Sequence, residues 1–169
     1  MADRPDRIAV CPGSYDPVTN GHLDIINRAA RVFDKVIVGV VDVQVRKQRP
    51  LFDAAERKGF IEQAVAANGV ENVEVKVFSN LLVAFARENG ATAIVKGLRA
   101  ISDFEYEFEM NQLNRTLAPE IESVYILASP DYSFIRSTGV KEMATFGGDV
   151  SELVPAPVAK ALGERLKKR

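Results

Sequence analysis

The segment from Cys11 to His22 reads CPGSYDPVTNGH and joins an apolar run to a helical pattern. The run before it, Ile8-Ala9-Val10, is typical of a buried strand, and residues 21–33 repeat apolar side chains at three- and four-residue spacing. The loop between them is rich in Gly, Pro, Asp and Asn, which favour turns. The segment therefore predicts a strand–loop–helix unit, and it delivers the only histidine of the chain to the first turn of the helix.

The same alternation continues through the rest of the chain. Strands are predicted at residues 7–11, 36–41, 73–78, 93–95 and 123–127, and helices at 21–33, 53–67, 81–88, 137–144 and 158–168. Such alternation implies a parallel sheet with right-handed crossovers. We therefore predict an α/β fold with a doubly wound five-stranded parallel sheet. Residues 1–169 are expected to form a single domain with a C-terminal helix.

One segment fits two patterns. Residues 103–109, DFEYEFE, alternate acidic and aromatic side chains as a half-buried strand would. However, the apolar residues between Tyr106 and Leu117 repeat at helical spacing, and Ser102 or Asp103 can cap a helix. Acidic residues also suit the first turn of a helix. These features favour the helical interpretation.

Composition excludes several classes of protein. The chain has 169 residues, 47% hydrophobic and 27% charged, an ordinary balance for a globular protein. No apolar run is long enough to span a bilayer or to serve as a signal peptide, so no membrane partner is expected. A single cysteine cannot form an internal disulfide, which makes the cytoplasm the default location. The net charge of −1 argues against a nucleic-acid partner.

The loop of residues 12–20 has the features of a phosphate site. It follows the first strand, and ligands of open α/β sheets bind beyond the carboxyl ends of the strands. Gly21 lets a ligand approach the backbone, and a helix start carries a partial positive charge of about +0.5. Thr19 or Asn20 can cap the helix, and His22 then points an N–H donor into the same space. The alternative is an ordinary helix start with a surface histidine.

Three strings together resemble one family. TNGH, at residues 19–22, resembles the T/H-x-G-H signature of the nucleotidyltransferase superfamily, which is similar to the HIGH motif of class I aminoacyl-tRNA synthetases. More narrowly, PGSYDPVTNGH (12–22), KGLRAISDFEYEFEMNQLNR (96–115) and YSFIRSTGVKE (132–142) resemble the phosphopantetheine adenylyltransferase family, in register over nearly the whole chain. The resemblance implies a Rossmann-like nucleotidyltransferase fold over residues 1–169. It also implies adenylyl transfer from ATP to 4′-phosphopantetheine in coenzyme A biosynthesis, Mg²⁺ carried with ATP, and a homohexamer.

The resemblance gives catalytic roles to His22, Lys47 and Arg99. The nucleophile would be a phosphate monoester with a second pKa of about 6, so it needs no strong protein base. His22 would stabilise the charge that develops at the α-phosphate and would not be a nucleophile. Lys47 falls in RKQRPLF, residues 46–52, which resembles a basic loop of the family that contacts substrate phosphate. This loop is longer than the family pattern, so Arg49 is an alternative ligand, and a merely solvated basic loop is another.

The remaining assignments also rest on the resemblance. It implies ATP contacts along all three strings, at Ser14, Tyr15, His22, Gly97, Leu98, Arg99, Glu107, Tyr132, Ser133, Phe134, Ile135, Arg136, Ser137 and Thr138. It implies phosphopantetheine contacts at Ser14, Lys47, Leu82 and Lys96. Without the family, Leu82 is equally well a core residue and Glu107 a solvated acid.

Two positions depart from the family pattern. The family usually has Arg where this chain has Lys96, and Ser where this chain has Arg136. Both side chains are cations that can bind phosphate, although lysine lacks the bidentate fork of arginine.

Other residue types limit the chemistry. Cys11 ends a strand that is expected to be buried, which favours a core residue over a reactive thiol. No His, Cys or carboxylate cluster has metal-ligand spacing, so Mg²⁺ is expected on ATP and not on a dedicated protein site.

Two other functions stay open: a nucleotidyltransferase with another phosphate acceptor, and a non-catalytic nucleotide-binding regulator. The intact T-x-G-H disfavours the regulator, because a binder needs no donor at the α-phosphate.

Overall fold

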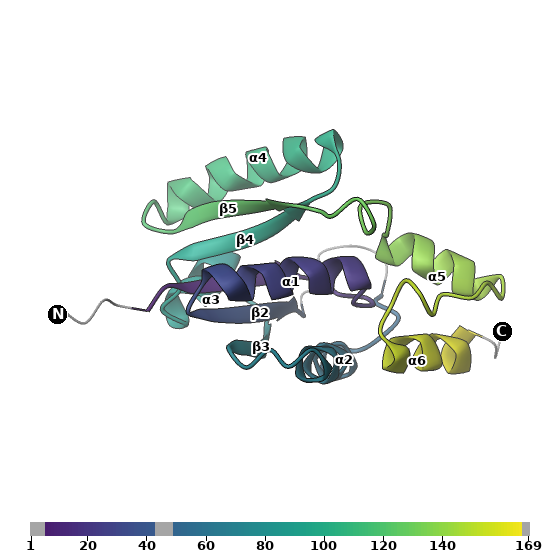
Figure 1. Cartoon of the computed structure of the whole chain (residues 1–169). Helices are drawn as coiled ribbons and strands as arrows, with labels where there is room; N and C mark the ends of the chain where they lie inside the picture. Colours follow the sequence, from purple (N-terminus) through teal and green to yellow (C-terminus); the bar gives the residue numbers. More distant parts are fainter. Residues whose placement is uncertain (1–5, 43–48, 167–169) are drawn as a thin grey trace.

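The computed structural model describes residues 6–42 and 49–166, and these contain a five-stranded parallel sheet flanked by helices (Figure 1). The strands are β1 (Ile8–Gly13), β2 (Lys35–Val41), β3 (Val73–Phe78), β4 (Ala93–Leu98) and β5 (Glu122–Leu127). The helices are α1 (Asn20–Val32), α2 (Ala54–Ala67), α3 (Leu82–Glu88), α4 (Ile101–Leu117), α5 (Ser137–Thr145) and α6 (Ala156–Leu166).

The order of the strands creates a switch in winding direction. The sheet runs β3-β2-β1-β4-β5 and every neighbouring pair is parallel. The chain therefore winds outward from β1 to β3 and then returns to the other side of β1 with β4. Beyond the carboxyl ends of β1 and β4, the two connections diverge, which is where ligands of doubly wound sheets bind. The predicted doubly wound α/β fold is confirmed.

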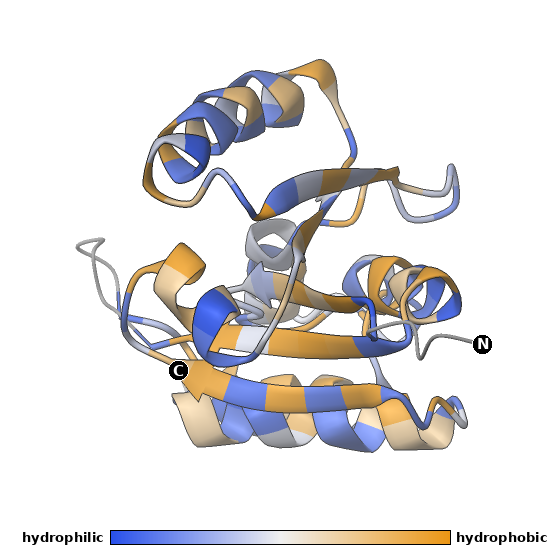
Figure 2. Ribbon diagram, turned by 90° about the vertical axis from the view of Figure 1, so that its left-hand side faces the viewer, coloured by the Kyte–Doolittle hydropathy of each residue, from blue (hydrophilic) through white to orange (hydrophobic). Residues whose placement is uncertain are grey.

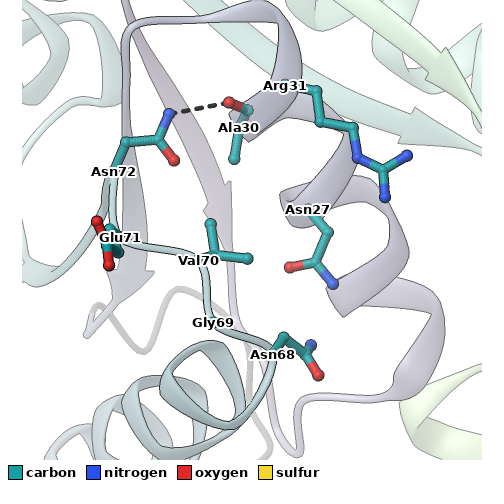
Figure 3. Close-up of a pocket in the computed structure, with 8 residues that line it drawn as sticks. All are labelled: Asn27, Ala30, Arg31, Asn68, Gly69, Val70, Glu71 and Asn72. Atoms are coloured by element: carbon teal, nitrogen blue, oxygen red, sulfur yellow. Dashed lines mark hydrogen bonds between the residues drawn. The ribbon is translucent and has the colours of Figure 1, made fainter.

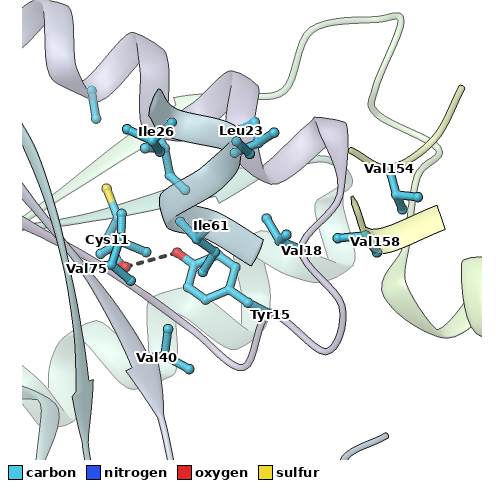
Figure 4. Close-up of a cluster of buried hydrophobic side chains, with 14 of the residues drawn as sticks. Cys11, Tyr15, Val18, Leu23, Ile26, Val40, Ile61, Val75, Val154 and Val158 are labelled. Carbon is cyan, nitrogen blue, oxygen red and sulfur yellow. Dashed lines mark hydrogen bonds between the residues drawn. The ribbon is translucent and has the colours of Figure 1, made fainter. Parts of the chain in front are cut away.

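The strands bury side chains in two cores, one on each face of the sheet. In β2, Val36, Val38 and Val40 belong to the core that also contains residues of α1, α2, α5 and α6, whereas Ile37 belongs to the core beside α3. Figure 4 shows part of the first core. Burial on both faces explains why β2 is a near-continuous apolar run. Figure 2 shows the contrast with the edge strand β3, in which hydrophilic and hydrophobic residues alternate.

Several elements extend beyond their predicted limits, among them β1, which ends at Gly13 and not at residue 11. β4 was predicted at residues 93–95 but continues to Leu98, so Lys96 and Gly97 lie in the strand and only Arg99 follows it. The close approach of α1 accounts for the glycine, because a Cβ at Gly97 would lie 2.9 Å from Cγ1 of Ile25. α6 begins two residues before its predicted start, with Pro157 in its first turn, where the missing N–H is tolerated.

The segment that fitted two patterns is helical, but its predicted caps are wrong. Ala100 is the N-cap residue of α4, and no side chain caps this start. Asp103 instead accepts hydrogen bonds from the backbone N–H and the Nε of Arg99, both at 3.1 Å. None of the residues of α4 is buried, and Leu113 is 60% exposed. The apolar stripe that predicted the helix therefore does not face the core of the chain itself.

Among residues 6–42 and 49–166, no helix is long and apolar enough to cross a bilayer.

Candidate active site

His22 and Arg99 lie on the two sides of the winding switch. His22 is in the first turn of α1, which follows β1, and Arg99 directly follows β4. The positive charge of Arg99 lies close enough to disfavour protonation of the His22 ring, and it contributes to the lowered pKa of that ring. The two predicted catalytic residues that the structure describes are therefore brought together. Lys47, the third, lies outside the described residues.

The imidazole of His22 is oriented by Thr19, which is the N-cap residue of α1. Nδ1 of His22 accepts the backbone N–H of Thr19 at 3.0 Å, and Oγ1 of Thr19 accepts the backbone N–H of His22 at 3.3 Å. This is a capping box in which histidine takes the place usually held by Glu or Gln. Because Nδ1 is an acceptor, the ring proton lies on Nε2, which is left as a donor.

The same surroundings keep the ring neutral. Burial, and to a lesser degree the positive charge of Arg99, lower the pKa of His22 from 6.5 to about 4. A neutral imidazole at pH 7 is a weak base but still a hydrogen-bond donor through Nε2. The ring also packs edge-to-face against Tyr15, with 5.1 Å between ring centroids. His22 is thus held as a fixed, uncharged donor at the switch.

The first turn of α1 offers fewer free donors than the sequence suggested. The backbone N–H of Asn20 donates to the carbonyl of Leu153 at 2.9 Å, and those of Thr19 and His22 are used by the capping box. Within the described ranges, the N–H of Gly21 alone in this turn has no protein acceptor. Most N–H groups at this helix start are therefore used within the protein, by the capping box and by the contact of Asn20 with Leu153.

Three other helix starts at this edge, those of α3, α4 and α5, lack a side-chain cap. The N-cap residues of α4 and α5 are Ala100 and Arg136, and neither makes a side-chain capping bond. An arginine has no acceptor to offer, so the first N–H groups of α5 have no partner from its N-cap side chain. Uncapped helix starts are suited to bind anions, and those of α4 and α5 flank His22 and Arg99.

Hydrogen bonds join the third string to the first two. Oγ of Ser137 donates to the carbonyl of Pro17 at 2.8 Å, which ties the start of α5 to the β1–α1 loop. Arg99 donates from Nη1 to the carbonyl of Ile135 at 3.1 Å, which ties the end of β4 to the same segment. Three segments far apart in the sequence therefore meet at the switch.

Lys96 of β4 and Arg99, which directly follows β4, are paired with acids of α4. Nζ of Lys96 lies 3.2 Å from Oε1 of Glu107, and Nε of Arg99 lies 3.1 Å from Oδ2 of Asp103. Burial opposes ionisation of Asp103, but hydrogen bonds from the side chain and backbone of Arg99, with a smaller contribution from Arg136, lower its pKa. A polyanion that binds these cations would have to exchange with the two carboxylates. Asp103 was not predicted as a partner, although its four-residue spacing from Glu107 placed both acids on one helix face.

Comparison with known proteins gives a consistent answer. Residues 10–143 match the Cytidylyltransferase-like family. The chain is 57% identical over 148 residues to the phosphopantetheine adenylyltransferase of Rubrobacter xylanophilus, with 88% of each chain covered. It is 48% identical over 159 residues to that of Alkaliphilus metalliredigens, with 94% of this chain and 99% of the relative covered. The chain belongs to the phosphopantetheine adenylyltransferase family.

A solved structure extends the comparison to the fold. A bifunctional NMN adenylyltransferase/ADP ribose pyrophosphatase from Francisella tularensis superimposes with a TM-score of 0.73 at 16% identity, covering 96% of this chain and 50% of that one. This likeness confirms the predicted fold, whereas the predicted family and enzyme class are confirmed by the relatives of 48% and 57% identity.

Not every residue that the phosphopantetheine adenylyltransferase resemblance singled out presents its side chain to the switch. Tyr15 is 5% exposed, and its hydroxyl donates to the carbonyl of Cys11 at 2.9 Å (Figure 4). Ser14 is exposed at the loop, and its carbonyl accepts a bond from Arg57. Leu82 packs against the core beside α3, as its alternative interpretation had it.

The residues of the third string and of β4 differ in exposure. Ile135 is buried, Phe134 is 70% exposed, and the others are exposed or half-buried: Gly97, Leu98, Tyr132, Ser133, Arg136, Ser137 and Thr138.

Cys11 carries the one thiol of the sequence, and this thiol is unreactive at neutral pH. Its side chain is buried in the first core, and desolvation raises its pKa to about 12. The thiol is therefore un-ionised at neutral pH and is not a nucleophile.

The candidate site is defined by the convergence of three segments. A hollow of about 430 Å³ lies at the other edge of the sheet, between residues 27–31 of α1 and the loop 68–72 that enters β3 (Figure 3). Asn72 donates there to the carbonyl of Ala30 at 2.9 Å. None of the predicted site residues lines this hollow.

The geometry of His22 predicts an unusual titration. Its imidazole should protonate near pH 4 and carry its proton on Nε2 above that pH, because burial and Arg99 disfavour the charged ring. Since the chain has one histidine, imidazole nitrogen shifts from NMR of the untagged protein report on it alone. A midpoint near 6.5, or a proton on Nδ1, would contradict the assignment.

The same shift sets a pH dependence of stability. Because the pKa of His22 is lower in the folded chain, the unfolded chain takes up the proton first as the pH falls from 6.5 to about 4. His22 should therefore lower the free energy of unfolding progressively across that window.

Proposed function

We propose that the chain transfers the adenylyl group of ATP to the phosphate of 4′-phosphopantetheine, giving dephospho-coenzyme A and pyrophosphate. The neutral Nε2–H of His22, fixed at the winding switch beside Arg99, is the observation that carries the proposal. The choice of acceptor is supported by relatives of 48% and 57% identity that bear the phosphopantetheine adenylyltransferase name.

The chemistry needs a donor more than a base. The phosphate monoester of the acceptor has a second pKa of about 6, so at neutral pH it is largely dianionic and can attack directly. One of its oxygens forms a bond to the α-phosphorus while the bond to the bridging oxygen of pyrophosphate breaks. The electron pair leaves with pyrophosphate. His22 meets the charge that develops on the α-phosphate, and a fixed neutral donor does so without reorganisation.

The phosphates of ATP find donors on both sides of His22. Arg99, Arg136 and the uncapped start of α5 hold the β- and γ-phosphates, and Glu107 contacts the adenosine. Lys96 is freed for phosphate when Glu107 turns to the nucleotide. Ser14, Leu82 and the basic stretch 46–52 take the acceptor.

Mg²⁺ enters the reaction bound to ATP, as part of the substrate. Across residues 6–42 and 49–166, no three His, Cys or acidic side chains gather in a way that suits a metal ion. The magnesium of ATP would therefore be held mainly by phosphate oxygens and water, as this ion prefers. Cytoplasmic ATP and the single cysteine of the chain are consistent with action in the cytoplasm.

Release of pyrophosphate is the direct test. Incubation with MgATP and 4′-phosphopantetheine should release pyrophosphate, whereas nicotinamide mononucleotide or a polyol phosphate should not replace the acceptor. Release with another acceptor only would support the related transferase, and nucleotide binding without release would support the regulator.

His22 has a structural and a chemical role, and two variants separate them. His22→Gln should keep the capping box, because Gln suits this position, yet lose the imidazole donor. We expect kcat to fall by about 10²–10³, the usual cost of one transition-state donor, with an unchanged melting temperature. His22→Ala should lose the same activity and about 1 kcal/mol of stability. A near-normal kcat in His22→Gln would refute the role of the ring.

We also propose a homohexamer, in which a second copy covers α4. The outer surface of this helix carries large apolar side chains that the chain itself leaves exposed: Ile101, Phe104, Tyr106, Phe108, Leu113 and Leu117. Several large apolar side chains left exposed on one helix are typical of a protein–protein interface. Charge placed on it should weaken the assembly.

Leu113→Arg is therefore expected to shift the protein to smaller species in sedimentation velocity. Gln63→Arg, on an exposed position of α2, is the matched control and should leave the distribution unchanged. Unchanged sedimentation of Leu113→Arg would contradict the assignment of α4 to a subunit contact.

A further inference from the structure

The dipeptide Leu51-Phe52, which ends the basic stretch, is bound entirely by charged side chains. The N–H groups of Leu51 and Phe52 donate to Oδ2 and Oδ1 of Asp16, both at 2.9 Å. The carbonyl of Leu51 accepts from Nη1 of Arg165 at 2.7 Å, and that of Phe52 accepts from Nε of Arg57 at 3.0 Å. All four backbone polar groups of the dipeptide therefore depend on three ionised residues from three different elements.

Two of these residues are buried, which sets them apart from ordinary surface charges. Asp16 is 7% and Arg57 is 2% exposed. Burying a charge is costly unless hydrogen bonds and an opposite charge compensate it. Arg57 finds its compensation in the carbonyls of Ser14 and Val41, at 2.6 and 2.9 Å. Such residues hold loops in one arrangement and add little net stability.

Asp16 links three segments that the resemblance assigns to substrates. It belongs to the loop that delivers His22, and its carboxylate accepts hydrogen bonds from the dipeptide that ends the basic stretch. The same carboxylate also accepts from Nζ of Lys141 at 2.8 Å, on α5. The start of α5 is the predicted contact for the ATP phosphates. One buried side chain of the first segment is thus bonded to the other two.

Arg165 extends this arrangement to the C-terminal helix. Its guanidinium pairs with both carboxylate oxygens of Glu56, at 2.6 and 3.0 Å, and lies 4.9 Å from the ring centroid of Phe52. α6 itself is anchored in the first core by Val158 and Leu162, which are fully buried. Arg165 therefore reaches the dipeptide from a fixed helix. Within residues 6–42 and 49–166 its hydrogen bonds go to Leu51 and Glu56, and none goes to His22, Arg99 or residues 132–138.

We infer that Asp16 and Arg165 are positioning residues for the acceptor, because they fix Leu51-Phe52, which is the end of the basic stretch. Neither residue is assigned a contact with substrate. This inference rests on the proposed function, in which that stretch takes the phosphate of 4′-phosphopantetheine. It gives the C-terminal helix a role in the reaction, since α6 supplies one of the bonds that hold the acceptor side of the site.

The test separates the two substrates. KM for 4′-phosphopantetheine and for ATP is measured by pyrophosphate release for the wild type, Arg165→Ala and Arg165→Lys. Arg165→Ala should raise the KM of the acceptor by about threefold to tenfold, the range expected for one or two lost hydrogen bonds, and change that of ATP by less than about twofold. Lysine can serve Leu51 or Glu56 but not both, so Arg165→Lys should be intermediate.

Arg87 provides a matched control. It also joins a backbone carbonyl, that of Leu117 at 2.9 Å, to a glutamate, Glu120, but it does so at the amino edge of the sheet. Arg87→Ala should leave both KM values unchanged. Asp16→Asn, which cannot accept two N–H groups and an ammonium in the same way, should raise the KM of the acceptor and also lower kcat through the His22 loop.

The outcomes distinguish a failure of the proposed function from a failure of the positioning role. A wild-type chain that releases no pyrophosphate from 4′-phosphopantetheine would refute the proposed function. An active wild type whose Arg165→Ala variant has an unchanged acceptor KM, or raises both KM values equally, would refute the positioning role alone. If Arg165→Ala does not fold, the Arg165→Lys values decide by the same criteria.

Discussion

The hydrogen bond from the backbone N–H of Thr19 to Nδ1 of His22 is the contact on which the rest of the site depends. It completes the first turn of α1, and it commits the ring proton to Nε2. Burial beside Arg99 then keeps the ring uncharged, with a pKa of about 4. A single interaction therefore starts the helix, chooses the tautomer and orients the donor. The histidine cannot be separated from the fold that presents it.

Charged side chains hold the segments around this donor. Asp16 and Arg57 bind backbone groups of Ser14, Val41 and Leu51-Phe52. Asp103 and Glu107 hold the cations that lie in β4 or directly after it. Fixed donors and charges lower a barrier because they need no reorganisation during the reaction. The ion pairs that α4 makes with Lys96 and Arg99 are partly exposed, so their cations can exchange a carboxylate for phosphate. Asp16 and Arg57 are buried, so their bonds to the backbone stay in place. The residues that hold the loops thus differ in burial from those that bind substrate.

Much of the fold could be predicted, because strands covered on both faces are continuous apolar runs and the helices between them show clear periodicity. The end of β4 was missed because Lys96 and Gly97 look like a loop. Periodicity could indicate that α4 is a helix but not that its apolar stripe lies outside the core. The role of Arg57 could not be read from the helical pattern, because its carbonyl partners come from distant loops. The tautomer of His22 depends on cap geometry, which no motif specifies.

The central claim is that a neutral His22 assists a single direct attack on the α-phosphorus of ATP. Cys11 is un-ionised and His22 is weakly basic, so neither favours an adenylylated enzyme. The stereochemical course with ATP made chiral by sulfur at the α-phosphorus tests this most directly. The account predicts inversion of configuration in the dephospho-coenzyme A analogue. Retention would reveal a covalent intermediate and contradict it.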